Sequence, residues 1–357
     1  MLLPTLPIYI KQQGISESQV GLVIGIFTLA AVAVRTLVGG LLDRYGRRIF
    51  MIAGLFLFAI AMCLYNWVSG LALLLLLRIF HGLSWAASTT AIGTSITDII
   101  PAGRRGEGMG WYGLAMTISM GIGPIMGVWI VQDYSFQTMF FLAALLTVAA
   151  LLLAAATKVP FTPNRQAGKI EFFDRSVLSI SVAIFFLTIT YGGITTYLPL
   201  FTESIRVNAG TFFLVYAITL TVTRPLAGRL SDRYGERVVT VPALIAMIAA
   251  LLVLSFSNGW FGVMLTAILY GIGFGAAQPI MQAVALRLAP AHKQGVANAS
   301  FFTAFDLGIG LGALLLGPVS QYFGYTVLFI VCAASAFISL LIFHKISRRE
   351  QKQERHA

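Results

Sequence analysis

The chain has 357 residues, of which 58% are hydrophobic and 10% charged, and its mean hydropathy is +0.87. This composition excludes a water-soluble globular domain, in which about a quarter of the residues carry charge. The net charge of +11 does not indicate nucleic-acid binding, because the basic residues lie in short segments between apolar blocks. Cys63 and Cys332 lie inside apolar blocks and the histidines are scattered, so we expect no metal site and no cofactor.

Apolar blocks long enough to cross a hydrocarbon core of ~30 Å predict eleven full transmembrane helices. In chain order we expect them at residues 18–42, 48–67, 71–97, 107–131, 136–157, 175–201, 209–230, 238–257, 260–288, 295–321 and 325–346. The ten residues before Lys11 cover half a crossing, so we expect them to be the outer end of a first helix of which most is missing. The predicted fold class is an all-α membrane protein with about eleven full transmembrane helices plus a stub of helix 1.

Basic residues gather in alternate loops. Nineteen of the 24 Lys and Arg residues lie on one side, whereas the opposite side holds Lys11 and Arg206, and Arg35, Arg78 and Arg224 lie within spans. By the positive-inside rule, the side with nineteen is cytoplasmic. We therefore expect a multi-pass protein of the cell (plasma) membrane, with its C-terminus in the cytoplasm.

The sequence repeats itself at a spacing of 189 residues. Segments 35–48 and 224–237 share nine identities, and five more identities at this spacing join Gly82 with Gly271, Pro101 with Pro290, Gly106 with Gly295, Gly121 with Gly310 and Gly123 with Gly312. Such a repeat predicts two homologous bundles in the same orientation. The expected organisation is an N-terminal bundle (1–157), a cytoplasmic linker (158–174), a C-terminal bundle (175–346) and a basic tail (347–357).

Segment 39–48, GGLLDRYGRR, resembles the signature Gly-x-Leu-x-Asp-Arg-x-Gly-Arg-Arg of the major facilitator superfamily, and segment 228–237 is its degenerate copy. Two further segments are similar to the drug:proton antiporter branch of that family. Segment 78–87, RIFHGLSWAA, resembles its Arg-x-x-x-Gly-x-x-x-Ala pattern with His81 in place of the usual glutamine, and segment 121–127, GIGPIMG, resembles its antiporter motif. The resemblance implies the major facilitator fold with two pseudo-symmetric helical bundles.

The repeated loop is expected to act as a gate between the halves. Gly39 and Gly46 allow a tight turn, and Arg47 can pair with Asp98. Asp43 can face the positive end of a neighbouring helix, and the resemblance implies that this neighbour is the helix beginning near Gly295. The other expected members of this gate are Arg44, Arg48, Asp232, Arg233 and Gly235. The alternative is a basic loop that only sets topology.

Charged residues inside the spans are the candidate coupling site. Arg78 needs a partner or a wet cavity, and the resemblance implies that it promotes proton release from a nearby carboxylate; the alternative is snorkelling to the outer surface. Asp306 lies near the middle of its span and is expected to bind a proton or a cationic substrate, or else to serve as a structural hydrogen-bond partner. His81 can relay protons or pack as a polar group. Arg35 and Arg224 occupy repeat-related positions, for which we expect structural roles.

Two further groups complete the candidate site. Gln278 and Gln282 lie one turn apart and are expected to line the cavity, because uncharged amides within the membrane need partners. In the helix-5 motif, Pro124 removes a backbone hydrogen bond and lets the helix bend, and the small residues Gly121, Gly123 and Gly127 permit close packing. Packing alone is the alternative for this motif.

The resulting hypothesis is a secondary transporter, not an enzyme, that exports small amphipathic molecules in exchange for protons by alternating access. We expect it to be a monomer in the lipid bilayer whose partners are its small-molecule substrate and protons, with no nucleic acid. The alternatives are uptake or facilitated diffusion of a polar solute, or a truncated membrane protein that does not transport. The substrate cannot be read from the sequence.

Overall fold

The computed structural model describes residues 1–101, 105–159, 174–289 and 294–354. Within these residues the chain forms eleven α-helices and one 3-10 turn, and no strand. The first half contains α1 Leu2–Gln12, α2 Glu17–Tyr45, α3 Arg47–Leu64, α4 Leu71–Ile99, α5 Arg105–Asp133 and α6 Phe136–Ala156. The second contains the 3-10 turn η2 Arg175–Val177, then α7 Leu178–Ser204, α8 Ala209–Tyr234, α9 Glu236–Ser255, α10 Trp260–Leu288 and α11 Gln294–Glu354.

The predicted all-helical membrane fold is confirmed. Nine of the described helices are long and apolar enough to cross a membrane, by length and composition. One of them, α11, contains two predicted spans, because the helix continues on both sides of Gly324, the one residue in it with non-helical dihedrals (φ 79°). The remaining predicted span corresponds to α5, which is not among these nine helices. The segment expected to be the outer end of a first helix forms α1, which has 11 residues.

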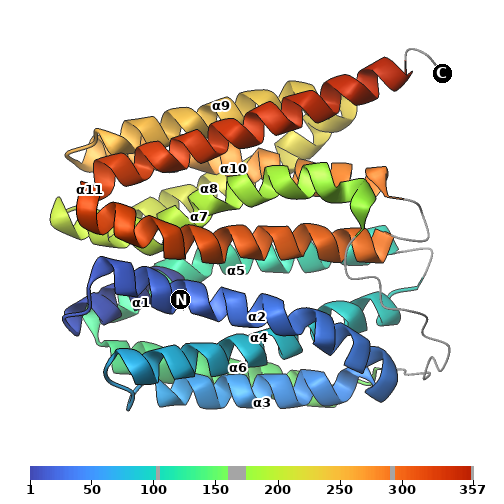
Figure 1. The fold of residues 1–357 in the computed structure, drawn as a ribbon. Helices are drawn as coiled ribbons and strands as arrows, with labels where there is room; N and C mark the ends of the chain where they lie inside the picture. Colours follow the sequence, from blue (N-terminus) through green and yellow to red (C-terminus); the bar gives the residue numbers. More distant parts are fainter. Residues whose placement is uncertain (102–104, 160–173, 290–293, 355–357) are drawn as a thin grey trace.

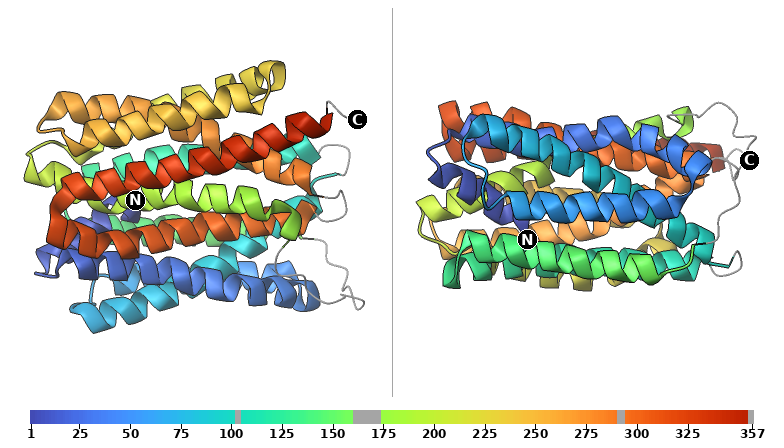
Figure 2. Two further views of the ribbon diagram at one scale, coloured as in Figure 1. Left: turned by 45° about the horizontal axis from the view of Figure 1, so that its top comes forward. Right: turned by 90° about the horizontal axis from the view of Figure 1, so that it is seen from below.

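The helices run side by side along one direction, and the two halves form adjacent layers (Figures 1 and 2). We name the two ends of this bundle by a turn that each contains. The Gly46 end holds the α2–α3 turn, the last residues of α4 and α6, and the first residues of α11; the Gly70 end holds the α1–α2 and α3–α4 turns and the Gly324 break.

Two glycine turns of nearly the same geometry mark the repeat in three dimensions. Gly46 has φ 93° and ψ 152°, and Gly235, 189 residues later, has φ 90° and ψ 152°. Each ends one helix, begins the next, and donates its N–H to the fourth carbonyl before it, that of Leu42 or Ser231. A Cβ atom disfavours positive φ, which explains glycine at both places.

Contacts between the halves involve three helix pairs, one of which is α1 with α7. In the first half α4 packs against α2 and α3, and in the second α10 packs against α8 and α9. Across the interface α2 packs against α11, and α5 packs against α8. Small residues allow the α2–α11 contact, since a Cβ atom on Gly25 would lie 2.7 Å from the Gly310 carbonyl oxygen. The α2–α11 seam brings charged residues of opposite halves together.

Candidate functional site

An ion pair joins the two halves within their membrane-spanning helices. Nη1 of Arg35 on α2 lies 3.0 Å from Oδ2 of Asp306 on α11, and the two side chains are 24% and 20% exposed. Asp306 follows the first residue of α11 by twelve residues, or about 18 Å along the helix. Opposite charges at this distance offset part of the cost that either would incur alone in a medium of low dielectric. Asp306 thus has a specific partner, which the sequence pattern did not identify.

The repeat-related arginine has a different partner. Nη2 of Arg224 on α8 donates to Oε1 of Gln278 on α10 at 3.0 Å. Gln282, one turn further along α10, donates its amide to Asn298 Oδ1 on α11 at 3.1 Å. The structural roles expected for Arg35 and Arg224 stay a prediction. The contacts of the two residues differ, because Arg35 joins the halves whereas this contact of Arg224 stays within the second.

Arg78 is buried in the first half and clamps α2. Its Nε donates to the Val23 carbonyl at 2.9 Å, its Nη2 donates to the Ile24 carbonyl at 3.1 Å, and its guanidinium carbon lies 4.2 Å from the centroid of the Phe27 ring. The side chain is 4% exposed, so it does not snorkel to a surface. No carboxylate is among the contacts of Arg78 within the described residues, and its participation in proton coupling stays a prediction.

His81 packs among aromatic rings one turn after Arg78. Its Nδ1 lies 3.1 Å from the Tyr65 hydroxyl, and its ring lies 4.6 Å from the Phe58 ring and 4.7 Å from the Phe27 ring, centroid to centroid. These neighbours surround a side chain that is 4% exposed. The contacts match those of a packed polar group, and a relay role for His81 stays a prediction.

At the Gly46 end, the described part of the expected gate contains the predicted Arg47–Asp98 contact. Nε of Arg47 lies 2.9 Å from Oδ2 of Asp98, so the α2–α3 turn is tied to the end of α4. Arg48 donates from Nη2 to the Ala155 carbonyl of α6 at 2.9 Å. The structure describes no side-chain placement for Asp43 and Arg44 and no surroundings for Gly39, and the expected approach of Asp43 to the helix near Gly295 also lies outside the described residues.

The second copy of the loop has exposed charged side chains. The side chains of Asp232 and Arg233 both face solvent, and the Arg233 guanidinium carbon lies 5.2 Å from the Tyr234 ring centroid. The turn itself is preserved at Gly235. This copy therefore keeps the backbone geometry of the first.

At the Gly70 end, Glu17 links the halves, and no motif indicated it. Oε1 of Glu17 at the start of α2 accepts from the Tyr325 hydroxyl at 2.7 Å, and Oε2 accepts from the Ser320 hydroxyl. The adjacent Ser18 donates its backbone N–H to Gln321 Oε1 at 3.2 Å. Two neighbouring residues of α2 thus hold the region around the Gly324 break, and this end is closed at the α2–α11 seam.

The helix-5 motif packs at the interface. A Cβ atom on Gly121 would lie 3.0 Å from Ala217 Cβ on α8, and one on Gly127 would lie 2.7 Å from the carbonyl oxygen of Met1. A Cβ atom on Gly123 would likewise lie 3.1 Å from the Met1 nitrogen, and Pro124 is buried within the helix. These glycines let α5 approach both α8 and the start of α1, which supports the packing role of the motif.

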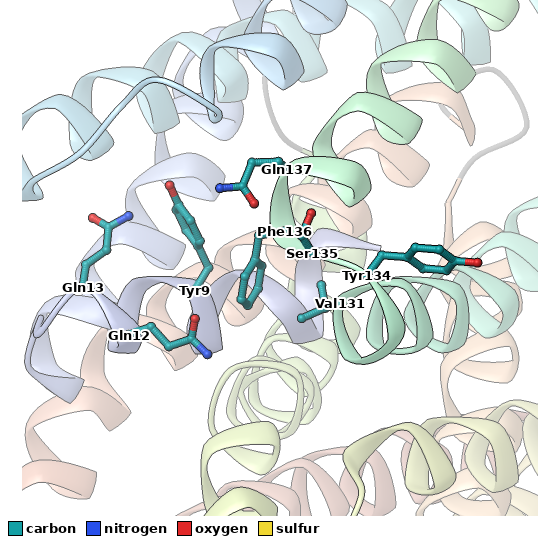
Figure 3. A pocket seen from close by; sticks show the side chains of 8 residues that line it. All are labelled: Tyr9, Gln12, Gln13, Val131, Tyr134, Ser135, Phe136 and Gln137. Atoms are coloured by element: carbon teal, nitrogen blue, oxygen red, sulfur yellow. The ribbon is translucent and has the colours of Figure 1, made fainter.

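A separate pocket of about 440 Å³ opens near the Gly70 end. Figure 3 shows its lining, which comes from the end of α1, the end of α5 and the start of α6: Tyr9, Gln12, Gln13, Val131, Tyr134, Ser135, Phe136 and Gln137. None of the sequence-predicted site residues lines it. The pocket is therefore distinct from the charged groups described above.

Comparison with known proteins gives consistent matches over the whole chain. The Major Facilitator Superfamily matches residues 1–219 and 180–357. Multidrug resistance protein MdtG of Klebsiella pneumoniae is 25% identical to this chain, and the match covers 100% of this chain and 92% of the relative. The staphylopine export protein of Staphylococcus aureus is 24% identical, and the match covers 92% of this chain and 87% of that relative. The crystal structure of a point mutant of the nucleoside transporter NupG superposes with a TM-score of 0.77 at 16% identity, covering 96% of this chain and 94% of that one.

Proposed function

The chain belongs to the Major Facilitator Superfamily, and we propose that it exports small amphipathic molecules in exchange for protons. The names of the multidrug resistance and staphylopine export relatives support export. The helix-5 segment similar to an antiporter motif favours the same direction. This proposal assigns the chain to the drug:proton antiporter branch of its family.

The observation that carries the proposal is the Arg35–Asp306 ion pair across the α2–α11 seam. A proton on Asp306 would remove its negative charge and with it the ionic attraction to Arg35. The halves are free to move at that seam when the attraction is lost, and they are drawn together again when the proton leaves. Proton binding and the movement of the halves are coupled in this way, as proton-driven exchange by alternating access requires.

The orientation in the membrane follows from charge. The side of the predicted crossings that holds nineteen of the 24 Lys and Arg residues includes the loop at Gly46. By the positive-inside rule we place the Gly46 end in the cytoplasm, together with the C-terminus. The Glu17 contacts then hold the outer end closed, and the substrate would enter from the cytoplasmic side. We propose that one chain in the lipid bilayer forms the whole transport unit, because its two halves form the moving interface.

The test uses purified protein in liposomes with an imposed pH gradient. Transport of two probes is followed, the cation ethidium and the anion 2-naphthoate, so that the assay does not presume the charge of the substrate. We expect the wild-type protein to drive at least one of them against its gradient in exchange for protons. Asp306→Asn, which cannot ionise, should lose proton-driven transport, whereas Asp133→Asn at the exposed end of α5 should keep it.

Two outcomes contradict the proposal. One is a wild-type protein that moves both probes only down their own gradients, which favours a facilitator. The other is an Asp306→Asn protein that elutes as a folded species and still responds fully to the pH gradient. Arg35→Gln adds a second check, because loss of the same ion pair from its other side should also impair coupling.

A further inference from the structure

We propose that the pocket at the Gly70 end binds a neutral sugar group, held by an aromatic ring and by amide side chains. The pocket measures about 440 Å³, and none of the expected coupling residues lines it, so the inference goes beyond the proposed export function. This volume lies within the range of about 300–1,000 Å³ that is usual for small-molecule sites. Three properties of the lining point to such a ligand: a fixed aromatic ring, amides with unused hydrogen-bonding groups, and neutrality.

Tyr9 of α1 lies at the centre of the lining, and its ring is fixed from two directions. Its hydroxyl donates to the Tyr65 carbonyl after α3 at 3.2 Å. Its ring centroid lies 5.2 Å from that of Phe136 and 5.2 Å from that of Phe140, both on α6. Figure 3 shows the partly exposed Tyr9 ring between Gln13 and Phe136. A ring held in this way offers an apolar surface whose side-chain freedom is already restricted before a ligand binds.

Amide side chains around this ring supply hydrogen-bond donors and acceptors. Gln13 is in use, because its Oε1 accepts from the Gly70 N–H at 3.4 Å. Gln12 and Gln137 are exposed, and neither is hydrogen-bonded to another residue in the described part of the chain. The first turn of α6 adds the backbone N–H groups of Phe136 and Gln137, which have no partner within the helix. A free amide can donate to one hydroxyl group and accept from another, which suits a ligand rich in hydroxyl groups.

The lining favours a ligand without charge. None of its eight residues is an acid or a base that ionises at neutral pH. Of the charged residues next to it in the sequence, Lys11 lies 3.4 Å from Glu17, and Asp133 is exposed outside the lining. An ion in the pocket would lose part of its hydration without gaining an opposite charge. A sugar, by contrast, has hydroxyl groups around an apolar face of C–H groups, which matches amides around an aromatic ring.

The pocket opens where exposed aromatic side chains mark the depth of the lipid head groups. Trp67 after α3 is 69% exposed, Trp129 of α5 is 55% exposed, and Tyr134, which lines the pocket, is 67% exposed. Trp and Tyr gather at the boundary between membrane and water. Both a free sugar and the sugar head group of a lipid can reach a pocket at this depth, and they share the chemistry that the lining recognises.

The experiment measures binding to the purified protein in phosphatidylcholine nanodiscs prepared without sugar detergents. Saturation-transfer difference NMR follows the titration with methyl β-D-glucoside and with D-glucuronate, a charged sugar with the same ring. We expect saturable binding of the glucoside and at least about tenfold weaker binding of the glucuronate. Gln12→Ala and Gln137→Ala should each weaken binding of the glucoside about twofold to tenfold, the usual effect of one neutral hydrogen bond. Asn258→Ala, which removes an exposed amide of the α9–α10 turn, should leave it unchanged.

Competition against methyl β-D-glucoside identifies the source of the sugar. Octyl β-D-glucoside has the same head group on an alkyl chain, and octyl tetraethylene glycol ether has the chain without the sugar. Stronger displacement by octyl glucoside than by glucose supports a lipid-linked sugar, and equal displacement supports a free one. Equal displacement by octyl glucoside and by the ether overturns the inference, because the chain alone would then explain binding.

Three further results overturn the inference. They are the absence of saturable glucoside binding, equal affinity for the glucuronate, and unchanged affinity in a protein that carries both Gln12→Ala and Gln137→Ala. Both glutamines are exposed, so these substitutions leave the packing of the helices intact, and an unchanged melting temperature verifies it. Transport enters none of these measurements, so the proposed proton exchange stands or falls separately with Asp306→Asn.

Discussion

Arg287 and Glu236 form an ion pair at the Gly46 end of the second half, with Nη2 and Oε2 2.8 Å apart. These two residues lie 189 positions after Asp98 and Arg47, which form the corresponding pair in the first half. The contact is therefore kept by both halves with the signs of the charges exchanged. It ties the turn between two helices to the end of a third in each bundle, which indicates a common structural purpose.

Exchanging the charges of the second pair should preserve it. We expect Glu236→Arg combined with Arg287→Asp to melt within about a degree of the wild type. Glu236→Arg alone places two cations together, and should lower the apparent melting temperature by a few degrees, because a partly exposed pair contributes about 1 kcal/mol or less. Thermal unfolding in detergent, followed by intrinsic fluorescence, checks both. If the double variant melts no higher than Glu236→Arg alone, the two pairs are not equivalent contacts with exchanged charges.

Removing the charge of Glu17 should open the Gly70 end. Glu17→Gln loses the ionised acceptor of the Tyr325 and Ser320 hydroxyls, and hydrogen bonds to charged groups are about twice as strong as neutral ones. Spin labels at the exposed residues Gln19 and Tyr322 report the distance across this seam in double electron–electron resonance. We expect a larger population at long distance in the variant.

The control for that measurement is Lys11→Gln. Nζ of Lys11 lies 3.4 Å from Glu17 Oε1, but its side chain is 45% exposed, so the contact is weakened by solvent. The distance distribution of Lys11→Gln should match that of the wild type. If Glu17→Gln and Lys11→Gln shift the distance distribution equally, the closure of this end depends on its total charge rather than on the specific hydroxyl contacts of Glu17.

Small side chains on α2 should be required for its contact with α11. A methyl group at Gly25 would collide with the Gly310 carbonyl, so Gly25→Ala should force the seam apart, lower the melting temperature and reduce transport severalfold. Gly228→Ala makes the same chemical change where nothing lies within 4 Å, and should be neutral or slightly stabilising. Melting curves and transport rates of the two variants decide the matter, and equal behaviour would argue against close packing.

Arg78 should act on stability through α2. Arg78→Lys keeps the charge but cannot reach the Val23 and Ile24 carbonyls with the same fork, so we expect a loss of about 2 kcal/mol and a melting temperature lower by several degrees. Arg78→Gln, which also loses the charge over Phe27, should be lower still. A lysine variant with unchanged melting but lost proton coupling would instead favour the coupling role.

The number and length of the crossings, the two-fold repeat and the glycine turns could be predicted from the sequence. Hydrophobic length is a property of consecutive residues, and a backbone bend with positive φ requires glycine at a particular position, as at Gly46 and Gly235. The Arg47–Asp98 contact was also predictable, because one residue begins a helix and the other ends its neighbour at the same side of the membrane.

The partners of the buried charges depended on the tertiary structure. Arg35 with Asp306 and Glu17 with Tyr325 come from opposite halves, and Arg224 with Gln278 from different helices of one half. Which face of a helix meets which neighbour depends on how the helices are rotated and packed, and in a long apolar helix the linear pattern holds little information about rotation. For this reason the repeat places Arg35 and Arg224 at equivalent positions in the sequence. Only the packing of the helices brings Arg35 to the carboxylate of Asp306 and Arg224 to the amide of Gln278.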